Sequence, residues 1–243
     1  MPVSTLELNR IKKTEFALAK GLIPKVLYRY MSFKKHTEDI IKNSSFLVQN
    51  PKTFNDPFDC QLEDVSLAGR ITSAENGAKV PAMVGILEEA KDKILREAGV
   101  LCFSKTNASL LMWAHYCESH SGFTMTFDAT KDTAFFTLPF KVKYTPDYPV
   151  IEFLNDPGRA VVAEITTKSD HWIYEEEIRV IKMHTGIQSF APACLTAITM
   201  GLRITSDNEM KLKEWLSVPA YTHVQLYRAV KADKKYGIDF HKA

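Results

Sequence analysis

The order of apolar and polar residues predicts short strands and short helices along the chain. Val26 to Tyr30 and Val100 to Ser104 are rich in β-branched and aromatic residues, which is typical of strands. Further strands are expected at residues 45–49, 123–127, 140–144, 177–182, 197–200 and 224–229. Helical spacing predicts helices at residues 37–42, 81–95, 159–167 and 207–216, and another that begins after Ser109.

An N-terminal helix is expected to begin at Ser4-Thr5-Leu6-Glu7, which has capping-box spacing, and to end near Gly21. Strands and long helices do not alternate one for one, and the chain contains neither G-x-G-x-x-G nor G-x-x-x-x-G-K-[ST]. These features favour a mixed α+β fold over a doubly wound sheet. We expect a mainly antiparallel central sheet with flanking helices.

We expect a single domain over residues 1–243, because a chain of this length with 45% hydrophobic content can bury one core. Within it, residues 1–24 are an N-terminal helical extension, 25–205 the core, and 206–243 a C-terminal helix and strand. The 31 Lys and Arg residues nearly balance the 29 Asp and Glu residues. A net charge of +2 is too small to indicate nucleic acid or an anionic membrane as a partner. A local basic groove is still compatible with this charge.

The chain opens with Met1-Pro2-Val3-Ser4, without a basic-then-apolar signal, and no apolar run approaches the roughly 18 residues of a membrane span. We therefore expect a cytoplasmic protein without a membrane partner. The four cysteines form no C-x-x-C pair, so reduced thiols are expected. On one helix His115 and Cys117 would point about 200° apart at ~100° per residue, and no metal site is expected there.

Three segments set charged or hydrogen-bonding groups directly against large aromatic residues. An ionised group beside apolar surface must be paired, hydrogen-bonded or given a shifted pKa, so such segments are candidates for a functional site. They are Phe54-Asn55-Asp56-Pro57-Phe58-Asp59, residues 111–123 with His115, Tyr116 and His120, and residues 172–179 with Glu175, Glu177 and Arg179.

These segments, with Leu27-Tyr28-Arg29-Tyr30 and Cys102-Phe103-Ser104, carry a resemblance to a known family. In order and content they resemble the bacterial and phage proteins catalogued as domain of unknown function 2971, from about residue 26 to about residue 205. The family carries no assigned activity. Its bacterial and phage setting motivates the hypothesis of a toxin or an antiphage defence effector.

A second resemblance is to the ADP-ribosyltransferase fold. Its arginine-serine-glutamate class places an Arg on the first core strand, a Ser on a middle strand and an E-x-E pair on a later strand. Arg29, Ser104 and Glu175-Glu176-Glu177 follow that order on suitable elements. The resemblance implies NAD as a co-substrate and transfer of ADP-ribose to an acceptor, whether protein, nucleic acid or water.

The chemistry of the side chains suggests a role for each. Cleavage of the nicotinamide–ribose bond develops oxocarbenium character, which Glu177 is placed to stabilise. Arg29 suits a pyrophosphate through its planar fork, and Ser104 would orient the ribose or the carboxamide. An aromatic platform for the nicotinamide would come from Trp113 or Tyr116.

Glu175 would share a strand face with Glu177 and orient or deprotonate the acceptor, and His115 is a candidate general base. Asn55 and Asp56 are expected at the lip of the pocket as cofactor-binding residues. Each assignment has a structural alternative. The two glutamates would form a solvated strand face paired with Arg179, the aromatic residues would pack in the core, and Asn55-Asp56-Pro57 would be a turn.

Two other classes of function stay open. One is a Mg²⁺-dependent nuclease or phosphodiesterase, with carboxylate ligands and a lysine as electrostatic partner: Asp56, Asp59, Glu175, Glu177 and Lys168. The other is a non-catalytic sensor that recognises a nucleotide-like molecule in an aromatic pocket. The oligomeric state does not follow from the sequence.

Overall fold

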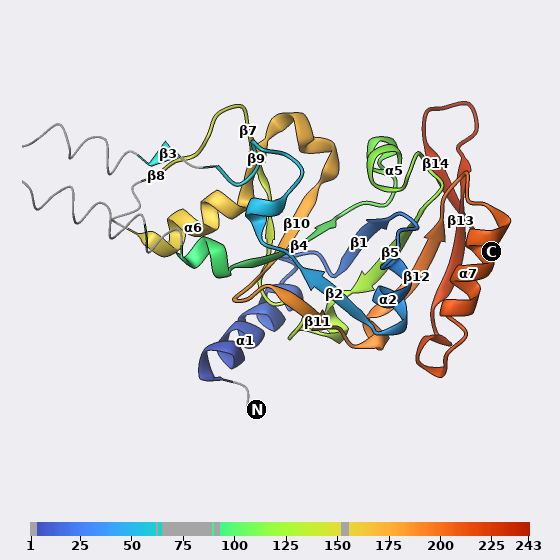
Figure 1. The fold of residues 1–243 in the computed structure, drawn as a ribbon, viewed down its shortest axis with the longest axis horizontal. Coiled ribbons are helices and arrows are strands. Elements are labelled where there is room, and N and C mark those ends of the chain that lie inside the picture. Colours follow the sequence, from blue (N-terminus) through green and yellow to red (C-terminus); the bar gives the residue numbers. More distant parts are fainter. Residues whose placement is uncertain (1–3, 62, 65–88, 90–92, 152–155) are drawn as a thin grey trace, which may run out of the picture.

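The protein is described by a computed structural model over residues 4–61, 63–64, 89, 93–151 and 156–243. Within these residues the largest sheet has eight strands (Figure 1). In spatial order they are β14 (Ile238–Lys242), β13 (Gln225–Lys231), β12 (Leu195–Met200), β5 (Phe123–Asp128), β1 (Val26–Met31), β4 (Gly99–Ser104), β10 (Glu177–Lys182) and β6 (Pro139–Lys141).

Neighbouring strands of this sheet are antiparallel, except that β12 and β13 run parallel. The expected mixed α+β fold with a mainly antiparallel sheet is therefore confirmed. The described residues also form three two-stranded sheets. These pair β2 (Ser45–Val48) with β11 (Gly186–Ser189), β3 (Glu63–Asp64) with β8 (Val150–Ile151), and β7 (Lys143–Thr145) with β9 (Thr167–Ser169).

Figure 1 shows α7 beside β13 and β14 at one end of the large sheet, and α1 and α6 towards the other end. No helix in the described part of the chain combines the length and apolarity needed to cross a membrane. The α-helices are α1 (Thr5–Ala19), α2 (Thr37–Lys42), α5 (Leu110–Tyr116), α6 (Pro157–Thr166) and α7 (Ser206–Trp215). The 3-10 helices are η1 (Pro51–Thr53), η2 (Ala129–Lys131), η3 (Asp170–Glu175), η4 (Pro192–Cys194) and η5 (Pro219–Tyr221).

Helix α1 begins where its capping box predicts. The Ser4 side chain accepts a hydrogen bond from the backbone N–H of Glu7, and the chain leaves the helix at Gly21 with φ +67°, which glycine adopts without strain. Leu18 on this helix is buried in the main core, whose centre is a group of phenylalanines that includes Phe46, Phe103 and Phe127. The core thus ties the N-terminal helix to the sheet.

The large sheet is nearly divided between β1 and β4. These strands pair at one position, Tyr28 opposite Ser104, whereas β4 pairs with β10 along six positions and β1 pairs with β5 along six. Near the start of β4, Val100 forms an isolated antiparallel bridge with Gln49, which follows β2. The separation of β1 from β4 leaves room for a pocket inside the sheet.

Two expected elements differ in the structure. Residues 140–144 fall in two short strands of different sheets, because residues up to Lys141 pair with β10 and residues from Lys143 pair with β9. Glu175 lies in η3 and is separated from β10 by Glu176, which has φ +43°, so it does not share a strand face with Glu177 as expected. Most of the helix expected at 81–95 lies outside the described residues. Residues 93–97, at its end, are helical.

Lys182 makes a test of this core possible, because its ammonium group is buried. Nζ donates to the carbonyls of Ala134 and Phe135 at 3.2 and 2.5 Å, and burial lowers the pKa of Lys182 from 10.5 to about 8. Between these pH values the unfolded chain binds the extra proton, so stability should rise with pH, by roughly 3 kcal/mol at about 1.4 kcal/mol per unit. We expect urea unfolding from pH 8 to 10.5 to show this rise as the difference in stability between the native chain and Lys182→Met. Both proteins share the opposing effect of the buried cysteine thiols, whose pKa values burial raises, and an equal slope in both proteins would contradict the assignment.

Candidate functional site

A pocket of about 490 Å³ lies where β1 and β4 separate. Its walls come from β1, α2, β2, β4, α5, β9, η3, β10 and a loop of residues 54–60, called the 54–60 loop below. Among the residues that the sequence singled out, Arg29, Ser104, Glu175 and Glu177 line it together. They come from three adjacent strands and from the 3-10 helix that leads into the third.

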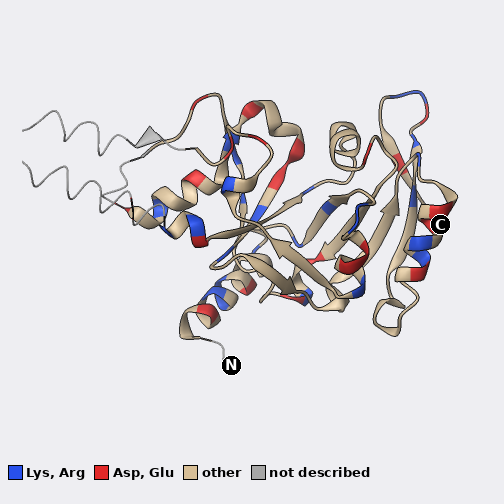
Figure 2. Ribbon diagram, viewed as in Figure 1, with Lys and Arg blue, Asp and Glu red and all other residues tan. Residues whose placement is uncertain are grey.

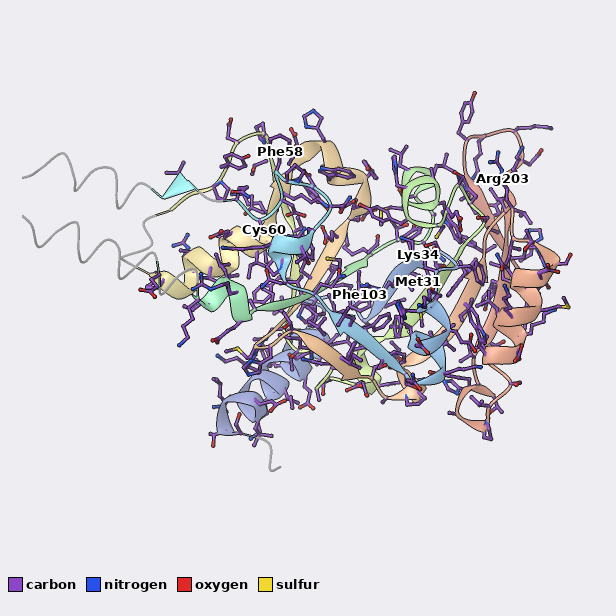
Figure 3. All side chains as sticks on the ribbon, viewed as in Figure 1. Met31, Lys34, Phe58, Cys60, Phe103 and Arg203 are labelled. Carbon is purple, nitrogen blue, oxygen red and sulfur yellow. The ribbon has the colours of Figure 1, made fainter. Side chains whose placement is uncertain are left out.

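The pocket has two ends of different character. Met31 and Lys34 line one end, Phe103 lies further in, and Asp59 lines the other end beside its neighbour Cys60. Figure 3 shows Phe103 between Lys34 and Met31 on one side and Cys60 on the other. A ligand that fills the pocket would therefore meet a lysine at one end and a group of charged side chains at the other.

Arg29 crosses the split between β1 and β4. Its Nη1 donates to the carbonyl of Cys102 at 2.7 Å, and its guanidinium carbon lies 4.8 Å from the centre of the Phe46 ring. Burial lowers the pKa of Arg29, although Glu177 opposes the shift. Its Nε is buried without a hydrogen-bond partner, and no carboxylate in the described residues forms an ion pair with it. The guanidinium is thus a cation with donors to offer to a ligand.

Ser104 and Glu177 face each other across β4 and β10, as direct partners in the register. The Ser104 hydroxyl donates to the carbonyl of Glu175 at 2.6 Å and accepts from the N–H of Thr106. This serine therefore fixes the turn of η3 that carries Glu175. Its hydroxyl is buried at the pocket wall, which limits its freedom to approach a ligand.

Glu177 is held as a carboxylate by two cations. Arg179 Nε lies 2.9 Å from its Oε1 and Arg179 Nη2 lies 3.0 Å from its Oε2, while Lys168 Nζ is 3.4 Å from Oε2. Burial alone would raise the pKa of Glu177, but the two cations outweigh it and hold the pKa at about 2. The backbone N–H of Glu177 donates to the Tyr144 hydroxyl, which fixes the start of β10.

Glu175 is held beside it. The Tyr116 hydroxyl donates to Oε1 at 2.6 Å, and Lys168 Nζ lies 2.6 Å from Oε2. Burial raises the pKa of Glu175, and the charge of Glu177 adds to the shift, against an opposing effect of Lys168. The two glutamates therefore differ in protonation behaviour, with Glu177 the more strongly ionised of the pair.

A buried charged cluster surrounds the two glutamates. It consists of Asp59, Lys168, Glu175, Glu177 and Arg179, all at most 9% exposed, and is called the charged cluster below. Arg179 binds both oxygens of Asp59, and Lys168 Nζ lies 3.6 Å from Asp59 Oδ2. Figure 2 shows red and blue ribbon segments close together where β9, η3 and β10 meet. Buried charges of this kind are more common at functional sites than elsewhere.

The other expected site residues are divided by the structure. Asn55 lines the pocket, and Tyr116 lines it and holds Glu175. Asp56 is not part of the lining, and its Oδ1 accepts from the N–H of Phe58, which is the geometry of an Asx turn. His115 is exposed on α5 outside the pocket, with its ring centre 6.2 Å from that of Tyr174.

The expectation that Trp113 offers its face to a ligand does not hold. Its side chain is fully buried in a second core, where it packs edge-on against Tyr30 and stacks over His120. Its indole N–H donates to the carbonyl of Asn107 at 2.6 Å. Spacing along α5 gives Trp113 and Tyr116 one helix face, but only Tyr116 reaches the pocket.

The carboxylates of the metal-dependent alternative meet at a cation of the protein itself. Asp59, Glu175 and Glu177 converge on the ammonium of Lys168, and Asp56 stays apart. Among the described residues no group of three His, Cys, Asp or Glu side chains converges as metal ligands would. The arrangement of donors therefore does not favour a divalent cation at this position.

Sequence reasoning gave Arg179 the wrong surroundings, because spacing places it on the face of Glu177 but does not tell whether that face is exposed. Arg179 is fully buried and belongs to the site. Spacing along the chain does not pair Asp59 or Lys168 with Glu177. The signal for their role is that the three segments contain more acidic than basic residues. Every buried carboxylate needs a cation, so a further cation must come from elsewhere in the chain.

A protein-family model described as "Protein of unknown function (DUF2971)" matches residues 112–180 of the chain. No curated protein and no solved structure matches the chain. The matched stretch is shorter than the expected 26–205, and it contains every member of the charged cluster except Asp59. Arg29 and Ser104 also lie outside it. The chain is thus similar, from α5 into β10, to a family whose name assigns no activity.

Proposed function

We propose that the chain binds NAD in the pocket and cleaves the bond between nicotinamide and ribose, transferring ADP-ribose to an acceptor. One observation carries the proposal. An arginine without a carboxylate partner in the described residues, a serine and an ionised glutamate line one pocket from three neighbouring strands. These are Arg29, Ser104 and Glu177, in the order that the ADP-ribosyltransferase resemblance implies.

The cationic side of the pocket suits the phosphates of the dinucleotide. Arg29 has a buried Nε without a partner, and Lys34 lines the same pocket. A guanidinium binds phosphate oxygens through parallel N–H donors, more strongly in a buried setting than in water. Aromatic rings in the lining, of which Phe46 is one, offer flat apolar surface for a base.

The acidic side suits the reacting ribose. As the bond from C1′ to the nicotinamide nitrogen breaks, its electron pair leaves with nicotinamide and positive charge develops on the sugar. The Glu177 carboxylate is ionised at neutral pH and fixed by two cations, so it provides preorganised negative charge. An oxygen or nitrogen of the acceptor then bonds to C1′. Glu175, whose pKa is raised, is placed to accept the proton that the acceptor loses.

The proposal is tested by incubating the purified protein with NAD, with and without cell lysate as a source of acceptors, and measuring nicotinamide release. We expect release by the native chain and at least about a 100-fold loss in Glu177→Gln. Glu176→Gln is the matched control, because Glu176 is exposed and its carboxylate pairs with Lys105 outside the pocket. NAD should raise the melting temperature of the native chain and of Glu177→Gln alike.

Absence of both nicotinamide release and a thermal shift with the native chain would overturn the proposal and make Mg²⁺-dependent nuclease assays the next step. A thermal shift without release would support the sensor alternative. The same two proteins test the toxin or defence hypothesis. Induced in cells, the native chain should slow growth and Glu177→Gln should not, and equal growth would count against a catalytic toxin.

A further inference from the structure

We propose that Asp59 is a positioning residue that acts on Glu177 through Arg179. This inference rests on the proposed function for its effect on turnover, but the coupling itself is a property of the fold. Asp59 lies at the end of the 54–60 loop and is separated from Glu177 by more than a hundred residues of sequence. The two carboxylates meet only through cations that both contact.

The guanidinium of Arg179 has five N–H donors, and the fold supplies an acceptor for each. Nε donates to Glu177 Oε1 and Nη2 to Glu177 Oε2 and Asp59 Oδ2, at 2.9, 3.0 and 2.6 Å. Nη1 donates to Asp59 Oδ1 at 3.0 Å and to the carbonyl of Ile165 at 2.6 Å. Nη1 also lies 3.3 Å from Cys60 Sγ. A planar group that is bound along two edges has one orientation. By holding one edge of the guanidinium, Asp59 therefore sets the direction of the other edge, which faces Glu177.

The 54–60 loop holds the guanidinium in a second direction. The ring centre of Phe54 lies 5.2 Å from the guanidinium carbon of Arg179, which places aromatic surface against its plane. Asp59 meets the same group at its edge. One loop thus supplies both the ring and the carboxylate that define where Arg179 sits.

Asp59 is itself held in place. The backbone N–H of Cys60 donates to Asp59 Oδ1 at 2.8 Å, and Cys60 adopts φ +55°, a left-handed conformation that is costly for a non-glycine residue. The N–H of Asp59 donates to the carbonyl of Asp56. The turn therefore aims the carboxylate at Arg179 before any ligand binds.

Asp59 does not hold Glu177 through its charge. A nearby negative charge disfavours a second carboxylate, so removing Asp59 would make Glu177 easier to ionise and would not abolish its charge. The effect of Asp59 must therefore be on the position of Glu177. A displaced carboxylate of the same charge gives slower turnover with little change in substrate binding, since the phosphate side of the pocket is untouched.

The test is nicotinamide release by Asp59→Asn, which keeps the shape of the side chain but places an amide N–H₂ against an N–H of Arg179. We expect kcat to fall about 10–100-fold, as is usual when a partner of a functional group is removed, while KM for NAD changes less than about threefold. Asp156→Asn is the matched control. Asp156 is an exposed N-cap of α6, where Asn caps as well as Asp, so its kcat should be unchanged.

A second variant guards against a failure of Asp59→Asn to fold. Phe54→Leu keeps every charge and removes the ring against the guanidinium, and it should lower kcat by a smaller factor with KM retained. A kcat within twofold of the native value in folded Asp59→Asn would overturn the inference. So would a fall of kcat and of NAD binding by the same factor, which indicates a general loss of structure.

A double-mutant cycle in urea unfolding separates this inference from the proposed function. The shift in urea midpoint of Asp59→Asn/Glu177→Gln should differ from the sum of the two single shifts, because both residues act through Arg179. Additive shifts would overturn the coupling. If the native chain releases no nicotinamide but the cycle shows coupling, the proposed function fails and the positioning contact stands.

Discussion

Replacing Arg179 by methionine is expected to lower the free energy of unfolding by about 3–5 kcal/mol. The substitution fills the same space but leaves the carboxylates of Asp59 and Glu177 buried, with Lys168 as their shared cation. Removing one partner of a buried ion pair is costly because the remaining charge has lost its solvation by water and gains nothing in return. Urea unfolding at neutral pH measures the loss.

Two further variants make this result specific. Adding Asp59→Asn and Glu177→Gln to Arg179→Met should restore much of the stability, since buried ion pairs replaced as a whole are often neutral in effect. Lys141→Met is the control for loss of a cation, because Lys141 is exposed on β6 opposite Ile178, and its effect should stay within about 0.5 kcal/mol. A loss below about 1 kcal/mol in Arg179→Met would show that the charged cluster is not closed to water.

Replacing Trp113 by alanine is also expected to lower the free energy of unfolding by about 3–5 kcal/mol. Removal of this fully buried indole leaves a cavity that its neighbours cannot close. The ring packs against Tyr30 of β1 and over His120, so the cavity would open between α5 and the sheet. The Asn107 carbonyl would also lose the indole N–H that it accepts. The measurement is again urea unfolding.

Trp113→Phe separates the core role from a ligand role. It keeps a ring in the core and loses the hydrogen bond to Asn107, so it should cost only about 1–2 kcal/mol. If Trp113 were a platform for the nicotinamide, the folded Phe variant would also weaken NAD binding. Binding equal to that of the native chain is the expected result, and a clear loss of binding by a stable variant would contradict the burial of this side chain.

Local rules account for much of the secondary structure. The capping box at Ser4 and the β-branched run of 177–182 predict α1 and β10 from short-range chemistry, which tertiary contacts then only reinforce. They fail where pairing with distant strands decides how a run is divided. The run of 140–144 is divided because its first part pairs with β10 and its second part with β9, both far along the chain.

The candidate site was predictable as a set of residue types and not as a geometry. The resemblance to the ADP-ribosyltransferase fold groups Arg29, Ser104 and Glu177, and these three residues lie on adjacent strands around one pocket. The partners of Glu177 could not be found in the same way. Whether Arg179 faces water or the interior depends on what covers its side of the sheet, and the 54–60 loop that covers it follows no periodic pattern.

The five donors of Arg179 also restrict how this protein can evolve. Because each acid of the charged cluster shares its cations with the others, a substitution at one position strands a buried charge at another. A change at one of these codons therefore lowers stability until a second change within the cluster compensates for it. We therefore expect Asp59, Glu177 and Arg179 to vary together among related chains.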